Sequence, residues 1–575
     1  MHGDGPGTVE GMEQIRLDGR VAIVTSPAGR MIAALALALA LGLSLPASAG
    51  EAPIVDAPAG AVRGEAVEGA DVYRGVPYAE PPVNELRWRA PQPLPRWSGV
   101  REARRFGPAC MQPESPFYDH PGMSEDCLFL NIWAPADARD APVMVWIHGG
   151  SLVGGAGSDP IHDGSAFAAQ GVMVVSINYR LGPLGWLAHP ALSAESERGV
   201  SGNYGLLDQI QALRWVRDNI GAFGGDPGNV TIAGESAGAL SVMLLMAAPE
   251  ARGLFHRAIA QSSYMITLPL LRDGPYVDWP DAETVGASVV EHLGAAGVED
   301  MRAMPAEAVI AGVAGTGYFP LATVDGRVLP DQLVDMFDRG EQAPVPILAG
   351  FNEGEIRSLR FLLPPAPESA EAYTREIRAR YGDLADAFLS RYPAEDIDGS
   401  MLATTRDALY GWTSERLTAK QTDLGAPSFL YYFDHGYPAA EAAGLRAFHA
   451  SEIPFVFGTT DSTPAYWPAV PRTPPHQRLS RAMLGYWAAF IRDGAPRAEG
   501  EPAWRPYDDA RTYMAFEEEP RLRAGPPNAY ALNEEVVCRR RARGDIAWHW
   551  NVGVIAPPLP PQAPGCESLL ARWSD

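Results

Sequence analysis

Positive charge is scarce in this chain of 575 residues, which has 46 lysine and arginine residues against 70 aspartate and glutamate residues. The formal net charge at pH 7 is -24, and Lys420 is the single lysine. A strongly acidic protein repels the phosphates of nucleic acids and of anionic membranes. We therefore expect neither a nucleic acid nor a stable membrane partner.

Cysteine is also rare, with four residues in the whole chain. No Cys-x-x-Cys pair or histidine cluster supports a metal centre, and we expect no metal and no other cofactor. In an oxidising compartment the economical arrangement is two local disulfides, although four cysteines allow three pairings. The expected disulfides are Cys110–Cys127 and Cys538–Cys566.

An apolar run near the N-terminus, MIAALALALALGLSLPASAG (31–50), is too short for a comfortable membrane span. It contains Ala-Ser-Ala at 47–49, the small-x-small pattern that a signal peptidase accepts. We therefore expect residues 31–49 to be a signal peptide and the protein to be secreted or periplasmic. A membrane anchor is the alternative, and residues 1–30 are an unassigned extension.

No repeat or long linker interrupts residues 50–535, which we expect to form one α/β domain. Apolar strand-like runs alternate with helical patterns there, as in a mostly parallel central sheet flanked by helices. The predicted strands are PVMVWI (142–147), VMVVSI (172–177), NVTIA (229–233), VPILAG (345–350) and SFLYYFD (428–434), and LLDQIQALRWVRDNI (206–220) is a predicted helix. Residues 536–575 are a predicted C-terminal tail, of which the proline-rich piece IAPPLPPQAPG (555–565) should be extended on the surface.

Ser236 lies between two glycines in the stretch IAGESAGAL (232–240). The β-branched run NVTIA precedes it, and a helical pattern that stops at Pro249 follows it. Such a strand-to-helix turn lets a strained serine project its hydroxyl, and the helix N-terminus favours a developing oxyanion. The alternative is a small residue in a crowded turn, but this context predicts a nucleophile.

A serine nucleophile needs a base, and the base needs an orienting acid. In α/β-hydrolases the acid and then the histidine follow the serine along the chain. The loop after VPILAG offers Glu353 and Glu355, between which the pattern alone does not choose. Four histidines follow: His435, His449, His476 and His549. His449, in a loop before an apolar segment, is weakly favoured, and His435 ends a strand.

The loop HGGSLVGG follows the strand PVMVWI and contains Gly149 and Gly150. Glycines permit a tight backbone approach, so N–H groups of this loop can face a developing oxyanion. The residue after the nucleophile, Ala237, is the expected partner donor. A phosphate-binding loop is the rival interpretation, but no Gly-Lys-Ser/Thr follows.

Several long stretches are similar, in the same order, to the type-B carboxylesterase family, which includes cholinesterases and bacterial p-nitrobenzyl esterases. The resemblance covers roughly residues 55–515. Its main stretches are YRGVPYAEPPVNELRW (73–88), SEDCLFLNIWAP (124–135), NYRLGPLGWL (178–187), GLLDQIQALRWVRDNIGAFGGDPGNVTIAGESAG (205–238), AIAQSS (258–263), FNEGE (351–355) and FHASEIPFVFG (448–458). It implies an α/β-hydrolase fold and a serine carboxylesterase that acts on small-molecule esters.

The resemblance also implies roles for single residues. The family's acid precedes a glycine, which makes Glu353 the expected acid beside the base His449. Ser262 would support the acid, and Glu235 would lie next to the triad. Further matches are the disulfide Cys110–Cys127 and two buried ion pairs near the site, Arg87–Glu125 and Arg180–Asp208.

This sequence departs from the family at two positions. Ser151 replaces the third glycine of the loop, so the expected oxyanion donors are the N–H groups of Gly150, Ser151 and Ala237. Phe117 replaces a tryptophan of cholinesterases, and tryptophan is the best cation–π partner, so choline esters are not the expected substrates.

Two other functions compete with the esterase. One is an amide or carbamate hydrolase with the same triad, and the other is a non-catalytic, cholinesterase-like binding protein. The intact set of serine, acid and histidine argues against the binding protein. Acyl length, alcohol size and oligomeric state stay open.

Overall fold

The computed structural model describes residues 52–115, 120–274, 279–546 and 548–566, together with the backbone of residues 13–17 and 20–24. The chain divides into two units, Met1–Ala52 and Pro53–Asp575. In the first unit, β1 (Glu13–Leu17) and β2 (Arg20–Val24) pair as antiparallel strands. The predicted signal peptide and Phe117 lie outside the described residues.

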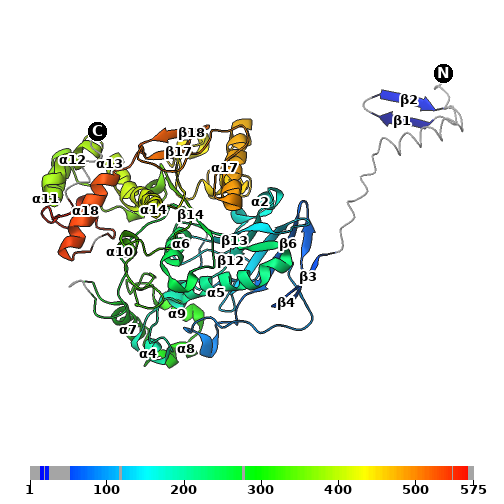
Figure 1. Ribbon diagram of the computed structural model, residues 1–575, viewed down its shortest axis with the longest axis horizontal. Coiled ribbons are helices and arrows are strands. Elements are labelled where there is room, and N and C mark those ends of the chain that lie inside the picture. Colours follow the sequence, from blue (N-terminus) through cyan, green and yellow to red (C-terminus); the bar gives the residue numbers. More distant parts are fainter. Residues whose placement is uncertain are drawn as a thin grey trace, which may run out of the picture. The chain divides into compact units, whose positions relative to one another are not determined.

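In the described part of the larger unit, an 11-stranded sheet has the order β18-β17-β16-β15-β14-β13-β11-β12-β10-β6-β5 (Figure 1). From β12 to β17 all neighbouring strands are parallel, and the strands at both edges pair antiparallel. The bounds are β5 Glu65–Val67, β6 Ala70–Pro77, β10 Phe129–Pro135, β11 Ala141–Ile147, β12 Met173–Ile177, β13 Gly225–Glu235, β14 Arg257–Gln261, β15 Ile347–Asn352, β16 Ser428–Phe433, β17 Thr512–Phe516 and β18 Pro520–Ala524.

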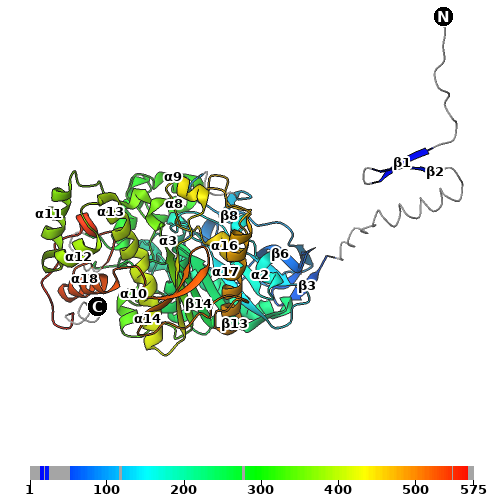
Figure 2. The same ribbon diagram turned by 90° about the horizontal axis from the view of Figure 1, so that it is seen from above.

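Helices cover both faces of this sheet (Figure 2). The main ones are α5 Tyr204–Asn219, α6 Ala237–Ala247, α14 Trp412–Asp423 and α17 Pro474–Asp493. Side chains of β11 alternate between two cores, as the period of a strand requires. Val143, Val145 and Ile147 join the core that contains α5, α6 and α14. Met144 and Trp146 join the core that contains α17.

The predicted α/β-hydrolase architecture is confirmed, because each predicted strand and helix corresponds to an observed element of the same type. The boundaries differ by a few residues, and one difference has consequences. VPILAG predicts a strand that ends at residue 350, whereas β15 runs to Asn352.

Both predicted disulfides form, with Cα–Cα distances of 4.9 Å for Cys110–Cys127 and 5.8 Å for Cys538–Cys566. Helix α18 (Tyr530–Arg543) runs across the predicted boundary at residue 535. Among the described residues from 544 to 566, the only further element is a short 3-10 helix, η9 (Gly553–Ile555). No helix that the structure describes has the length and apolar character needed to cross a bilayer.

Candidate active site

Ser236 occupies the turn between β13 and α6. Its φ of 55° and ψ of -120° are rarely adopted by residues other than glycine. The turn is tight, since a Cβ added to Gly238 would lie 2.0 Å from the carbonyl oxygen of Ile147. Glycine at this position therefore allows α6 to begin directly against the end of β11. The predicted strand-turn-helix arrangement around Ser236 is confirmed.

His449 lies in the loop before α16 (Ile453–Phe457). Its Nδ1 is 2.5 Å from Oε2 of Glu355, which is fully buried. Its Nε2 is 3.2 Å from Oε1 of Glu235, the residue before Ser236. One ring nitrogen of His449 is thus held by a carboxylate, and the other faces the turn that carries the serine.

The carboxylate beside His449 is Glu355, so the prediction that Glu353 orients this histidine is wrong. Because β15 continues to Asn352, the loop begins two residues later than predicted. The chain turns at Gly354 into a 3-10 helix, η5 (Glu355–Arg357). This turn brings Glu355 back over the strand end, where its Oε1 accepts a hydrogen bond of 2.8 Å from the N–H of Asn352.

Glu353 lies among arginines instead. Its Oε1 is 3.0 Å from Nη1 of Arg446 and 3.8 Å from Nη1 of Arg406, and its Oε2 is 3.8 Å from Nε of Arg357. These ion pairs link the loop after β15 to neighbouring segments. Glu353 therefore has a structural environment and makes no hydrogen bond to His449.

A second buried carboxylate, Glu452, lies behind the site. It accepts hydrogen bonds from Nε2 of Gln261 at 2.9 Å and from Nδ2 of Asn352 at 2.6 Å. Burial raises the pKa of Glu452, and the nearby charge of Glu355 raises it further. The hydrogen bonds from Asn352 and Gln261 favour the charged carboxylate and oppose part of this increase in pKa.

Glu235 and His449 influence each other strongly. Burial raises the pKa of Glu235, with smaller contributions from Glu452 and Glu355. Burial alone lowers the pKa of His449, but the facing carboxylates of Glu235 and Glu355 outweigh it and raise this pKa. The charge of Glu235 thus raises the pKa of His449, and the charge of His449 lowers the pKa of Glu235.

The glycine loop after β11 lies directly against the serine turn. A Cβ added to Gly149 would meet the carbonyl oxygen of Glu235 at 2.8 Å and the Cβ of Ser236 at 3.2 Å. Ser151 follows with a φ of 57°, in the left-handed region. A side chain at position 149 would thus force the loop away from Ser236.

The N–H groups predicted as oxyanion donors are available for a ligand. In the described part of the chain, the N–H groups of Gly150 and Ser151 donate to no protein acceptor. Ala237 is the first residue of α6, where N–H groups have no acceptor within the helix. These three groups belong to the two segments that flank Ser236.

The profile of the carboxylesterase family matches residues 51–530. The chain belongs to this family. A fumonisin B1 esterase of Sphingopyxis macrogoltabida is 36% identical over 473 residues, covering 80% of this chain and 85% of the relative. A para-nitrobenzyl esterase of Bacillus subtilis is 35% identical over 465 residues, covering 78% of this chain and 91% of the relative. The solved structure of a PNB esterase has a TM-score of 0.69 at 33% identity, covering 82% of this chain and 97% of that chain. The chain is therefore a carboxylic-ester hydrolase, and the resemblance to p-nitrobenzyl esterases is confirmed.

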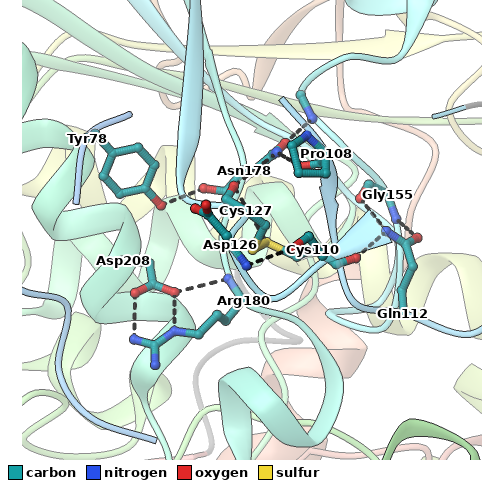
Figure 3. The surroundings of a disulfide bond; sticks show 12 residues. Tyr78, Pro108, Cys110, Gln112, Asp126, Cys127, Gly155, Asn178, Arg180 and Asp208 are labelled. Atoms are coloured by element: carbon teal, nitrogen blue, oxygen red, sulfur yellow. Dashed lines mark hydrogen bonds and ion pairs between the residues drawn. A yellow bond between two sulfur atoms is a disulfide. The ribbon is translucent and has the colours of Figure 1, made fainter. Parts of the chain in front are cut away.

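Buried hydrogen bonds hold the glycine loop of this carboxylesterase from behind (Figure 3). The side chain of Gln112 accepts a hydrogen bond from the N–H of Gly155 at 2.8 Å and donates one to its carbonyl oxygen at 3.1 Å. Nε2 of Gln112 also donates to the carbonyl oxygen of Cys110 at 3.0 Å. The disulfide Cys110–Cys127 is thereby connected to the loop.

The predicted ion pairs Arg87–Glu125 and Arg180–Asp208 both form. Arg180 binds Asp208 through Nε at 2.8 Å and Nη2 at 2.7 Å, and both side chains are buried (Figure 3). Two residues later the N–H of Gly182 donates to the carbonyl oxygen of Leu152 at 2.7 Å. Removing one partner of a buried pair costs about 3–5 kcal/mol, so this pair helps to fix the loop.

Ser262 is buried at the end of β14, where its N–H donates to the carbonyl oxygen of Gly350 at 2.8 Å. Among the described residues, its hydroxyl makes no hydrogen bond with Glu353 or Glu355. Support for the acid comes instead from the backbone of Asn352. The contact predicted for Ser262 is therefore absent from the described part of the chain.

Ser236, His449 and Ser151 line one cavity of about 1260 Å³. Of the described residues around it, none is a lysine or an arginine. Two histidines in its wall are uncharged at neutral pH, because burial lowers the pKa of His148 to about 4 and that of His162 to about 3. Neither of these two histidines therefore offers a positive charge to a substrate carboxylate.

Sequence reasoning missed two parts of the site. Glu355 could have been favoured over Glu353 only with the correct end of β15. His549 and Trp550 also line the cavity, although they belong to the predicted C-terminal tail. The stretch Trp548-His549-Trp550 indicates a buried or cavity-lining position, because three aromatic rings in succession are unusual in a segment exposed to water.

Proposed function

We propose that this protein is a serine carboxylesterase that hydrolyses uncharged esters through an acyl-enzyme on Ser236. The observation that carries the proposal is the position of His449, with Nδ1 against Glu355 and Nε2 toward the serine turn. Glu355 holds the proton on Nδ1, so the neutral histidine has its lone pair on Nε2. That nitrogen is the base that the serine hydroxyl needs.

In the first half of the reaction, Nε2 of His449 takes the proton of the Ser236 hydroxyl while Oγ attacks the ester carbonyl carbon. Negative charge moves to the carbonyl oxygen, where the N–H groups of Gly150, Ser151 and Ala237 stabilise it. The tetrahedral intermediate collapses, its bond to the alcohol oxygen breaks, and His449 returns the proton to the leaving alcohol. An ester between the acyl group and Ser236 is left.

In the second half, His449 takes a proton from a water molecule that attacks the acyl carbon. The same backbone donors stabilise the second oxyanion. Collapse breaks the bond to Oγ, and the proton on His449 returns to Ser236. The products are a carboxylic acid and the restored enzyme.

A series of p-nitrophenyl esters from C2 to C12 tests this proposal. We expect hydrolysis of at least the short members, and loss of activity after treatment with a serine-directed organophosphate. The label should be found on the peptide that contains Ser236. Hydrolysis that persists in fully labelled protein would contradict the acyl-enzyme.

The oxyanion assignment predicts different effects for two changes at Ser151. Ser151→Ala keeps the backbone N–H, so kcat on small esters should stay within a few-fold of the wild type. Ser151→Pro removes that donor and should lower kcat by about 10²–10³, as the loss of one oxyanion donor does in other enzymes. Circular dichroism and thermal melting must first show that the proline variant is folded. A loss in the alanine variant as large as that in the proline variant would identify the hydroxyl as the donor.

The facing pair Glu235 and His449 predicts a shift in the pH dependence. The charge of Glu235 raises the pKa of His449, so Glu235→Gln should lower that pKa. The neutral base then persists to lower pH, and the acid limb of the kcat/KM profile should move down by about one pH unit. An unmoved limb would show that Glu235 is already protonated in the free enzyme.

We also propose that the protein is exported, as the apolar run at residues 31–49 and its Ala-Ser-Ala end suggest. The two disulfides support an oxidising compartment. Intact-mass analysis of the protein from its own host should then give a chain that begins at Gly50. A retained segment 31–49 would contradict cleavage.

A further inference from the structure

The C-terminal segment forms part of the cavity wall, although it lies beyond residue 530, where the family match ends. His549 and Trp550 line the same cavity as Ser236 and His449. A segment outside the matched region therefore contacts the space in which we propose that the ester binds.

Ring contacts connect Trp550 with the histidine of the site. The ring of His449 is 5.3 Å from that of Tyr410, and the ring of Tyr410 is 6.1 Å from that of Tyr264. Tyr264 in turn lies 6.4 Å from Trp550 in an edge-to-face contact. Because all four residues line the cavity, a continuous aromatic surface extends from His449 to the C-terminal segment.

The same surface continues past Trp550. Phe319 meets Trp550 edge to face at 6.4 Å, and the ring of His549 is 4.9 Å from those of Trp550 and Trp279. Aromatic rings prefer edge-to-face and offset contacts, so a further ring from a substrate can pack against such a surface in a favourable geometry.

Trp548 fixes the backbone directly before the two cavity residues. It is 2% exposed, and its backbone N–H donates to Oγ1 of Thr267 at 3.1 Å. Its Nε1 donates to the carbonyl oxygen of Ala408 at 2.7 Å, and its ring lies 5.3 Å from that of Trp412. The segment is therefore anchored in the core before it reaches the cavity.

The chain after Trp550 is anchored as well. The N–H of Gly553 donates to the hydroxyl of Tyr381 at 2.9 Å, and Nη1 of Arg380 donates to the carbonyl oxygen of Ala556 at 2.8 Å. The disulfide Cys538–Cys566 then joins the segment to α18. Held at both ends, the wall is ordered before a ligand arrives, which reduces the entropy lost on binding.

The wall carries no charge at neutral pH. Burial lowers the pKa of His549 to about 4, and the aromatic rings that contact Trp550 belong to Tyr264, Phe319 and His549. Such a surface suits an apolar ring better than a charged group.

We propose that the segment 548–550 is the specificity-determining wall of the site, and that Trp550 selects esters which carry an uncharged aromatic group. This inference rests on the proposed function. The aromatic group belongs to the alcohol or to the acid of the ester, and the two parts of the experiment distinguish these cases.

The experiment compares kcat/KM within two substrate series. The first holds the acid constant, with methyl, benzyl and 2-naphthylmethyl acetate, and the second holds the alcohol constant, with ethyl acetate and ethyl 3-phenylpropionate. The measured quantity is the ratio of kcat/KM for an aromatic ester to that for the small ester. Because both rates come from the same sample, this ratio does not depend on the fraction of protein that is folded.

Trp550→Ala should lower the ratio about tenfold in at least one series, and Trp550→Phe should keep most of it. Ile555→Ala is the matched control. Ile555 lies five positions after Trp550 in the chain, is 47% exposed and does not line the cavity. Its ratios should equal those of the wild type.

Three results would overturn the inference: ratios within twofold of the wild type in Trp550→Ala, an equal loss on all esters in that variant, or the same change of ratio in Ile555→Ala. A wild-type protein that hydrolyses none of these esters would instead contradict the proposed function. The two failures are therefore distinguishable.

Discussion

Replacing Ser236 with alanine should lower kcat on p-nitrophenyl acetate by about 10³–10⁶, because the acyl-enzyme can no longer form. His449→Ala should cause a loss of the same order, since a hydroxyl without a base is a weak nucleophile. The serine and the histidine act together in one step, so the loss of either one already removes that step. The double variant should therefore be no slower than either single variant. Initial rates at saturating ester, with active-site titration of the wild type, measure these effects.

His435→Ala is the control for the histidine change. His435 is buried against Phe455 and His476, with ring distances of 5.4 Å and 5.1 Å, and does not line the cavity. Its loss should reduce stability and leave kcat per folded molecule near that of the wild type. Ser236→Ala with more than about 1% of wild-type kcat would show that the chemistry does not depend on Ser236.

Glu355→Gln should lower kcat by about 10³–10⁴, through the state of the histidine rather than through the fold. A glutamine amide in place of Oε2 can donate to Nδ1 of His449, which would leave the proton on Nε2. That tautomer cannot accept the serine proton, and the imidazolium formed in the transition state loses its carboxylate partner. KM should change little, because Glu355 lies behind the histidine and does not line the cavity.

Glu353→Gln is the matched control, two positions away and of the same chemistry. Its carboxylate pairs with arginines, and the side chain is 14% exposed. Weakening these pairs should lower the melting temperature by a few degrees and leave kcat within about threefold of the wild type. A larger loss of kcat in Glu353→Gln than in Glu355→Gln would reject the assignment and restore the acid predicted from the resemblance.

Much of the site could be predicted from the sequence, because it depends on local geometry. NVTIA before Ser236 and the helical pattern after it place the serine on a strand-to-helix turn, and the small residues around it permit the strained backbone. The glycine loop after PVMVWI was predicted in the same way. In both cases steric limits on neighbouring residues decide the backbone conformation, so a short stretch of sequence is enough to predict it.

The choice between Glu353 and Glu355 needed the tertiary structure. It depends on where β15 ends, and that is decided by pairing: Asn352 still lies opposite Phe433 of β16, a residue 81 positions later in the chain. The stretch FNEGE by itself does not indicate that Asn352 pairs with Phe433. The end of β15 at Asn352, two residues later than predicted, places Glu355 beside His449 and Glu353 among arginines.

The sequence by itself determined the parallel α/β sheet, the serine turn, the glycine loop and the local pairing of the cysteines, since each follows from hydrophobic period, turn sterics or short loop closure. Only the tertiary structure decided which carboxylate orients His449 and where the C-terminal segment lies. Trp548 is buried against Trp412, and that contact brings Trp550 into the cavity. Contacts between residues far apart in the chain arise from the packing of the whole protein, and no local pattern specifies them.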